Sequence, residues 1–139
     1  MTAVDTNVLV RFLTRDDPDQ FRRAVALFNS ETIHVPDTVW LETEWVLRFA
    51  YGYEPSAVIT AFRGLLGLPQ VRVTDATRLL LSIEWHGAGL DFADAMHLAG
   101  SQDIGTLATF DKAFARKSEN LGVCRVVDLS KTVQPGQGR

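Results

Sequence analysis

Apolar and polar residues follow two different periods along this chain, and each period predicts its own kind of element. Short β-branched stretches predict strands, and apolar residues recurring three and four positions apart predict helices. The strands are expected at Thr2–Val4, Thr32–Val35, Val71–Val73, Thr106–Thr109 and Arg125–Val127. The helices are expected from Thr6 to the break at Asp16-Asp17-Pro18, from there to about Asn29, over Thr38–Tyr51, Ser56–Leu68 and Ala76–His86, from Asp91 to about Gln102, and over Lys112–Leu121. This alternation predicts an α/β domain with a short-stranded parallel sheet covered by helices on both faces.

The length of 139 residues fits one domain, expected over residues 1–130 and followed by a flexible tail at 131–139. Cys124 is the single cysteine, which excludes an intramolecular disulfide. No signal peptide or membrane span is expected, so we predict a soluble, cytoplasmic protein without a membrane partner. The net charge of −3 argues against direct binding of duplex DNA by this chain.

Two acidic residues follow predicted strands. Asp5 comes directly after Thr2–Val4, and Asp111 follows Thr106–Thr109 with only Phe110 between. Ligand sites of open α/β sheets form beyond the carboxyl ends of the strands. This placement is the first indication of a functional site.

Two further acidic residues stand on predicted helices among apolar neighbours. Glu42 lies within or beside the apolar stripe of its helix, whereas Glu44, about 200° around the helix, is expected to meet solvent. Asp94 is surrounded by small and apolar residues on the first turn of its helix. Buried charge is costly unless it is paired or binds a metal ion.

Several carboxylates converging on one point would need a cation, because two of them 4 Å apart repel by about 4 kcal/mol at an effective dielectric of 20. Hard oxygen ligands select Mg²⁺ or Mn²⁺, and no Cys or His grouping suits zinc. A divalent ion in such a pocket can lower the pKa of a water and neutralise a scissile phosphate. The chemistry indicated is phosphodiester hydrolysis.

Most of these residues also have a purely structural interpretation. Asp5, Asp91 and Asp111 could each cap the helix that follows, and Asp94 could stand on its first turn because the helix dipole favours a carboxylate there. Glu42 has no such alternative. The three tryptophans, Trp40, Trp45 and Trp85, fit helix packing better than stacking on nucleobases. Basic residues could hold RNA phosphates, although most are expected to form only a solvated face and none is favoured over the others: Arg11, Arg15, Arg22, Arg23, Arg48, Lys112, Arg116 and Lys117.

Four segments, in order, carry a family resemblance: Val4–Leu9, Leu41–Leu47, Asp91–Ala99 and Thr109–Lys112. Together they resemble the PIN-domain ribonucleases, in particular the VapC-type toxins of type II toxin–antitoxin pairs, from about Thr2 to Leu129. The resemblance implies a Rossmann-like three-layer α/β/α sandwich and an endoribonuclease that depends on Mg²⁺ or Mn²⁺. Glu44 departs from the family pattern, since its position is usually apolar.

The resemblance also implies roles for individual residues. The acidic quartet would be Asp5, Glu42, Asp94 and Asp111, serving as catalytic and metal-binding residues. Asn7 and Thr109 would support the site by hydrogen bonding, and Asp91 as an outer carboxylate. The implied partners are an RNA substrate, a second copy in a homodimer, and a cognate antitoxin that covers the active site.

We hypothesise that Asp5, Asp94 and Asp111 hold one or two metal ions and that Glu42 orients or deprotonates the attacking water, leaving a 3′-hydroxyl and a 5′-phosphate. Two alternatives remain open. One is a phosphatase with Asp5 as covalent nucleophile, although such enzymes usually carry a second Asp where this chain has Asn7. The other is a module that binds RNA or protein without cutting.

Overall fold

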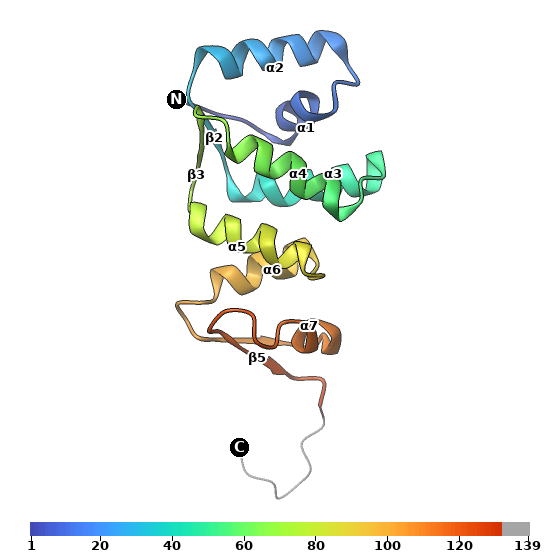
Figure 1. The fold of residues 1–139 in the computed structure, drawn as a ribbon, viewed down its shortest axis with the longest axis vertical. Coiled ribbons are helices and arrows are strands. Elements are labelled where there is room, and N and C mark those ends of the chain that lie inside the picture. The colour runs from blue at the N-terminus through green and yellow to red at the C-terminus, as the bar shows by residue number, and fades with distance from the viewer. Residues whose placement is uncertain (132–139) are drawn as a thin grey trace, which may run out of the picture. The chain divides into compact units, whose positions relative to one another are not determined.

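The computed structural model describes residues 1–131, and the chain divides into two compact units, Met1–Thr77 and Arg78–Arg139. Figure 1 labels most of the helices and strands, with the colour running from blue at the N-terminus to red at the C-terminus. The predicted tail falls, apart from Lys131, outside the described residues. Over residues 1–131, no helix is both long and apolar enough to cross a membrane.

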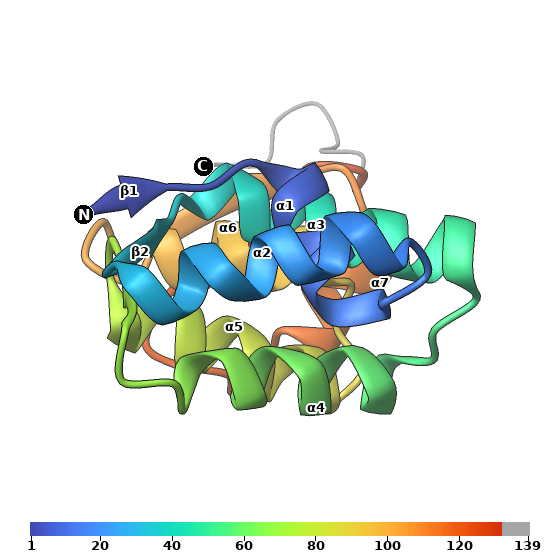
Figure 2. The same cartoon turned by 90° about the horizontal axis from the view of Figure 1, so that it is seen from above.

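The first unit contains a parallel sheet of three strands in the order β1-β2-β3. Its elements are β1 (Thr2–Ala3), α1 (Thr6–Thr14), α2 (Pro18–Ser30), β2 (Ile33–Val35), α3 (Asp37–Tyr51), α4 (Pro55–Leu66) and β3 (Val71–Val73). Thr2 pairs with Ile33 and Ile33 with Val71, and Figure 2 shows β1 and β2 running side by side. The helix α1 packs against both α2 and α3.

The second unit contains a parallel pair of strands, with Thr106 opposite Arg125 and Thr109 opposite Asp128. The elements from the boundary onward are α5 (Ala76–Gly87), α6 (Phe92–Gly100), β4 (Thr106–Thr109), α7 (Lys112–Lys117) and β5 (Arg125–Asp128). Every strand pairing among the described residues is therefore parallel, as the sequence predicts. The pairs form two separate ladders, one in each unit.

Aromatic packing holds the core of the first unit. Phe12 stacks on Phe28 with ring centroids 4.1 Å apart, and Trp40 meets the ring of Phe62 edge-on at 4.9 Å. The buried indole N–H of Trp40 donates to the carbonyl of Val35 over 3.2 Å, so its polar atom is satisfied. A fully buried tryptophan of this kind contributes about 4 to 6 kcal/mol of hydrophobic burial before entropy is subtracted.

A smaller apolar cluster supports the second unit. Leu90, Leu98 and Phe114 are buried there, together with the free thiol of Cys124. The helix α6 contributes one face to this cluster, while its first turn carries the polar residues Asp91 and Asp94. Ala95, Leu98 and Ala99 of α6 belong to this cluster, which anchors the helix whose first turn carries Asp91 and Asp94.

The prediction for the orientation of α3 is wrong. Glu44 is buried, with 2% of its surface exposed, whereas Glu42 is exposed. The buried stripe runs through Trp40, Thr43, Glu44 and Leu47, at helical spacing. Apolar residues occur on several sides of this helix, so the periodicity does not show which side meets the core.

The buried carboxylate of Glu44 pairs with Arg48, whose Nε donates over 2.8 Å. Trp45, predicted to pack inside, is instead 55% exposed and lies beside Phe49, with ring centroids 4.9 Å apart. The guanidinium of Arg48 lies over the Phe49 ring at 4.4 Å. Trp40 and Trp85 are buried as predicted.

The last helix is shorter than predicted, ending at Lys117 instead of Leu121. The hydroxyl of Ser118 donates to the carbonyl of Ala115 over 3.0 Å, and Asn120 takes a left-handed backbone with φ 66°. A left-handed residue cannot continue a right-handed helix. The apolar periodicity therefore continues beyond the point where the backbone leaves the helix.

Candidate active site

Asp5 lies just beyond the end of β1 and caps α1. The backbone N–H of Val4 donates to the carbonyl of His34 over 3.1 Å, which holds the end of the strand in the sheet. One carboxylate oxygen of Asp5 then accepts from the N–H of Val8 over 3.1 Å. The capping interpretation is confirmed, but it uses only one oxygen: over residues 1–131 the other has no hydrogen-bond partner. Asp5 can therefore cap the helix and bind a ligand at the same time.

Glu42 shares a pocket with Asp5. The pocket has a volume of about 430 Å³, and Asp5, Asn7 and Glu42 all line it. The hydroxyl of Thr6 donates to Oε1 of Glu42, which joins the first turn of α1 to the middle of α3. Predicted residues from two separate motifs thus meet in the first unit.

Thr6 is a site residue that the sequence reasoning missed. It follows Asp5 directly, at the start of α1, so its hydroxyl is placed beside the same strand end. In the sequence, only its position next to Asp5 pointed to a role for Thr6, because threonine is common at the start of helices. The structure shows its role through its hydrogen bond to Glu42, 36 positions away in the chain.

Asp91 and Asp94 lie together at the start of α6. One oxygen of Asp91 accepts from the backbone N–H of Asp94 over 3.3 Å, so Asp91 is the N-cap. Partial burial raises the pKa of the Asp94 carboxyl, and the negative charges of Asp91 and Asp111 raise it further. His97 and Lys117 offset part of this effect. The ionised form of Asp94 is thus disfavoured by its neighbours.

Asp111 and Thr109 form a tight turn after β4. The N–H of Asp111 donates to the hydroxyl of Thr109 over 3.0 Å, and the Asp111 carboxylate accepts from the N–H of Phe114 over 3.0 Å. Thr109 therefore orients the backbone of Asp111, and Asp111 caps α7. Because Asp111 contributes to the raised pKa of Asp94, these two carboxylates also act on each other within the second unit.

A comparison with known families covers both groups of acidic residues. The pattern that defines the PIN domain matches residues 2–120. The chain belongs to the PIN-domain family. The match spans all seven residues predicted for the site, and the predicted fold class, a PIN-type α/β sandwich with a short-stranded parallel sheet, is confirmed.

Two solved structures resemble this PIN domain. One is VapC20 of Mycobacterium tuberculosis, a toxin that cleaves the sarcin-ricin loop, with 21% identity over 84% of this chain and 94% of that chain and a TM-score of 0.43. The other is VapBC2 of Rickettsia felis bound to a DNA fragment from its promoter, with 13% identity, coverage of 91% and 97%, and a TM-score of 0.38. A comparison with curated proteins finds no match.

The donor chemistry of this PIN domain suits a hard divalent cation, since every candidate ligand is a carboxylate oxygen. The pKa of the Asp94 carboxyl is raised first by partial burial and then by the negative charges of Asp91 and Asp111, and a bound cation would relieve this repulsion. Over residues 1–131, however, no three or more His, Cys, Asp or Glu side chains form a ready metal site. Asp5 and Glu42 belong to the first unit, Asp94 and Asp111 to the second, and their convergence stays a prediction.

Proposed function

We propose that this PIN domain is a metal-dependent endoribonuclease that hydrolyses RNA phosphodiester bonds. One observation carries the proposal: over residues 1–131, none of the carboxylates of Asp5, Glu42, Asp94 and Asp111 forms an ion pair. Some acidic residues elsewhere are paired, among them Asp16 with Arg11, Glu44 with Arg48 and Asp103 with Arg78. Four unpaired carboxylates in family motifs are available for a cation and a substrate.

Mg²⁺ or Mn²⁺ would be held by Asp5, Asp94 and Asp111, and would supply charge neutralisation at the phosphate and a more acidic water. The helix caps prepare these ligands. The backbone N–H of Val8 fixes one oxygen of Asp5, and that of Phe114 fixes one oxygen of Asp111. These side chains therefore lose little further freedom when they bind a cation. Asp91 orients the first turn that carries Asp94.

Glu42 is proposed as the base for the attacking water. Thr6 donates to Oε1 and fixes the carboxylate, while over residues 1–131 Oε2 has no partner and can accept a proton. The water oxygen bonds to phosphorus, its proton passes to Glu42, and the bond from phosphorus to O3′ breaks. Protonation of O3′ by solvent leaves a 3′-hydroxyl and a 5′-phosphate. Asn7 lines the same pocket and is proposed to hydrogen-bond the substrate or its water.

We also propose that the chain is the toxin of a toxin–antitoxin pair, on the strength of its VapC-like motifs and its membership of the PIN family. Its partners would be RNA, a second copy of the chain, and an antitoxin segment that covers the carboxylates. The exposed rings of Trp45 and Phe49 offer an apolar surface for a protein contact. Growth arrest on expression alone, relieved by co-expression of the neighbouring antitoxin gene, would support this biology.

The enzymatic proposal is tested by cleavage of a labelled single-stranded RNA. We expect Mg²⁺ or Mn²⁺ to support cleavage, EDTA to abolish it, and Asp94→Asn to slow it at least about 100-fold. Asp103→Asn is the matched control, because Asp103 is an exposed carboxylate of the same unit, paired with Arg78. Cleavage by Asp94→Asn at the wild-type rate, or cleavage that survives EDTA, would refute the proposal.

The two alternatives have separate tests. A phosphatase that uses Asp5 as nucleophile would form an aspartyl-phosphate, detectable by its mass after acid quench. A binding module without activity would retain RNA in Mg²⁺ without shortening it. Neither result is expected here.

A further inference from the structure

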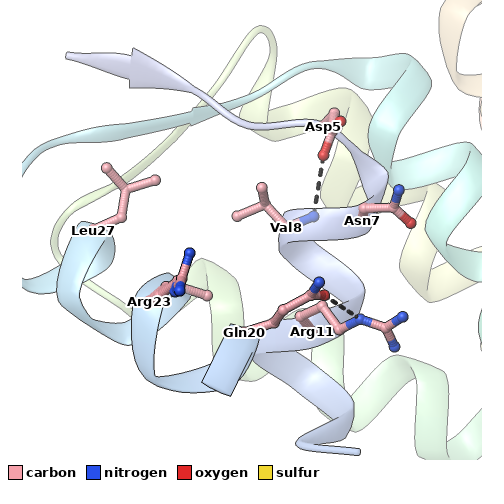
Figure 3. Close-up of a pocket in the computed structure, with 8 residues that line it drawn as sticks. Asp5, Asn7, Val8, Arg11, Gln20, Arg23 and Leu27 are labelled. Carbon is pink, nitrogen blue, oxygen red and sulfur yellow. Dashed lines mark hydrogen bonds between the residues drawn. The ribbon is translucent and has the colours of Figure 1, made fainter. Parts of the chain in front are cut away.

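A second pocket adjoins Asp5 on the other side of α1, with a volume of about 450 Å³ (Figure 3). Asp5 and Asn7 line it from the start of α1, and Arg11 from one turn further along the same helix. Gln20 and Arg23 line it from α2. Asp5 is the only carboxylate among the residues that form this wall, whereas two of them are arginines.

Arg11 is held rigidly in this wall. Its Nε donates to Gln20 over 2.7 Å, and its Nη1 donates to the Asp16 carboxylate over 2.9 and 3.1 Å and to the Tyr51 hydroxyl over 3.1 Å. Tyr51 in turn donates to Asp16 over 2.6 Å. Over residues 1–131, the remaining nitrogen, Nη2, has no hydrogen-bond partner. A guanidinium fixed on two nitrogens and free on the third is ready to bind an anion at little entropic cost.

Arg23 stands on α2 with 79% of its side chain exposed, and its Nε contacts Asp19 over 3.1 Å. Its terminal nitrogens have no partner among residues 1–131. Arg22, the preceding residue, contacts the same Asp19 over 3.4 Å but does not line the pocket. The two neighbours therefore share their helix, their charge and their partner, and differ in whether they face the pocket.

We propose that this pocket binds the backbone phosphate of a nucleotide that flanks the scissile bond, through Arg11 and Arg23. The inference rests on the proposed function, because Asp5 lines both this pocket and the one that contains Glu42. An RNA strand whose reacting phosphate lies at Asp5 continues along α1, where Arg11 lies six residues or roughly 9 Å of helix axis further on. Guanidinium groups match phosphate oxygens with parallel N–H donors, and this donor set favours a phosphodiester over a neutral ligand.

The test measures binding of a fluorescein-labelled, 12-nucleotide RNA of mixed sequence by anisotropy, in Mg²⁺ over a range of salt concentrations. All proteins carry Asp94→Asn, so that the RNA stays intact. The slope of log K against log salt is negative, and each lost phosphate contact makes it less steep by about 0.7 for a single strand. We expect Arg11→Gln and Arg23→Gln each to make the slope less steep by about this amount and to weaken binding about five- to tenfold at 100 mM salt. Arg22→Gln should change binding less than twofold.

A second measurement locates the contact. A methylphosphonate, which removes the charge of one phosphate, is placed at successive positions of the RNA. At the contacted position it should weaken binding to the parent protein but not to Arg11→Gln. Thermal melting checks the fold of Arg11→Gln, and Arg23→Gln, at an exposed position, tests the pocket even if Arg11→Gln is unstable.

Unchanged slopes in both pocket variants, an equal effect of Arg22→Gln, or the absence of salt-dependent binding would each overturn the inference. None of these results affects the nuclease proposal, which depends on cleavage by the wild-type protein in Mg²⁺. If the parent with Asp94→Asn cuts the RNA at the wild-type rate, the catalytic assignment of Asp94 fails instead. The two failures are therefore distinguishable.

Discussion

Asp5 has two roles that a pair of substitutions can separate. It caps α1 through a hydrogen bond of 3.1 Å from Val8, and it is proposed as a metal-binding catalytic carboxylate. Asparagine caps helices about as well as aspartate but carries no charge. Alanine removes both the cap and the charge. Asp5→Asn therefore tests the chemistry, and Asp5→Ala tests the chemistry together with the fold.

The expected changes in stability follow from the single exposed capping bond. Asp5→Ala should lower the free energy of unfolding by about 1 kcal/mol, which for a chain of 139 residues lowers Tm by roughly 3–5 °C. Asp5→Asn should stay within about 0.5 kcal/mol of the wild type, since it loses only part of the interaction with the helix dipole. Both should lose at least about 100-fold in RNA cleavage, or about 2.7 kcal/mol of transition-state stabilisation.

Asp17→Ala is the matched control. Asp17 caps α2 in the same way, accepting from the N–H of Gln20 over 3.0 Å, but lines neither pocket next to Asp5. It should lose about the same 1 kcal/mol and keep its nuclease activity below the melting temperature. Unfolding is followed by circular dichroism and cleavage by gel electrophoresis. The reasoning is refuted if Asp5→Asn cuts RNA at the wild-type rate, or if Asp17→Ala loses activity to the same extent.

Three further predictions concern stability, measured by thermal or urea unfolding. Arg48→Met removes the partner that lies 2.8 Å from the buried Glu44 carboxylate and should lower the free energy of unfolding by about 2–3 kcal/mol. This is less than the roughly 3–5 kcal/mol expected for a fully buried pair, because Arg48 is 37% exposed. Adding Glu44→Gln should recover part of the loss, and no recovery would contradict the pairing. Because the pKa of Asp94 is raised in the folded protein, the protonated Asp94 carboxyl is favoured more in the folded protein than in the unfolded chain. The stability that comes from this protonation is lost as the pH rises through the folded pKa. In EDTA, Asp94→Asn should therefore raise Tm at pH 7, and this gain should vanish below about pH 3; an equal gain at both pH values would contradict the argument. Gly122→Ala places a Cβ against the Gln102 side chain at φ 68° and should cost roughly 1–2 kcal/mol, whereas an unchanged midpoint would show that the loop adapts.

Local chemistry explains why much of the site could be predicted. Asp5, Asp91 and Asp111 each bond a backbone N–H three residues later, so their placement depends on a few neighbouring positions. The strands and helices that carry them follow from short β-branched stretches and from apolar residues at helical spacing. Their parallel pairing follows from the strand–helix alternation, since parallel strands need a crossover between them.

Other features depend on contacts between distant segments. Glu42 and Glu44 could not be assigned to solvent and core from α3 alone, because the packing of Trp40 on Phe62 selects the buried side. Thr6 becomes a site residue only when α1 and α3 meet.

The sequence by itself determined the parallel α/β fold and the acidic residues at its strand ends, because strand and helix formation and helix capping act over a few neighbouring residues. Only the tertiary structure decided which side of α3 is buried and that the hydroxyl of Thr6 donates to Oε1 of Glu42. It also decided how Asp16, Gln20 and Tyr51 orient Arg11. These are pairwise contacts between side chains up to 40 positions apart, and such contacts exist only once the helices have packed.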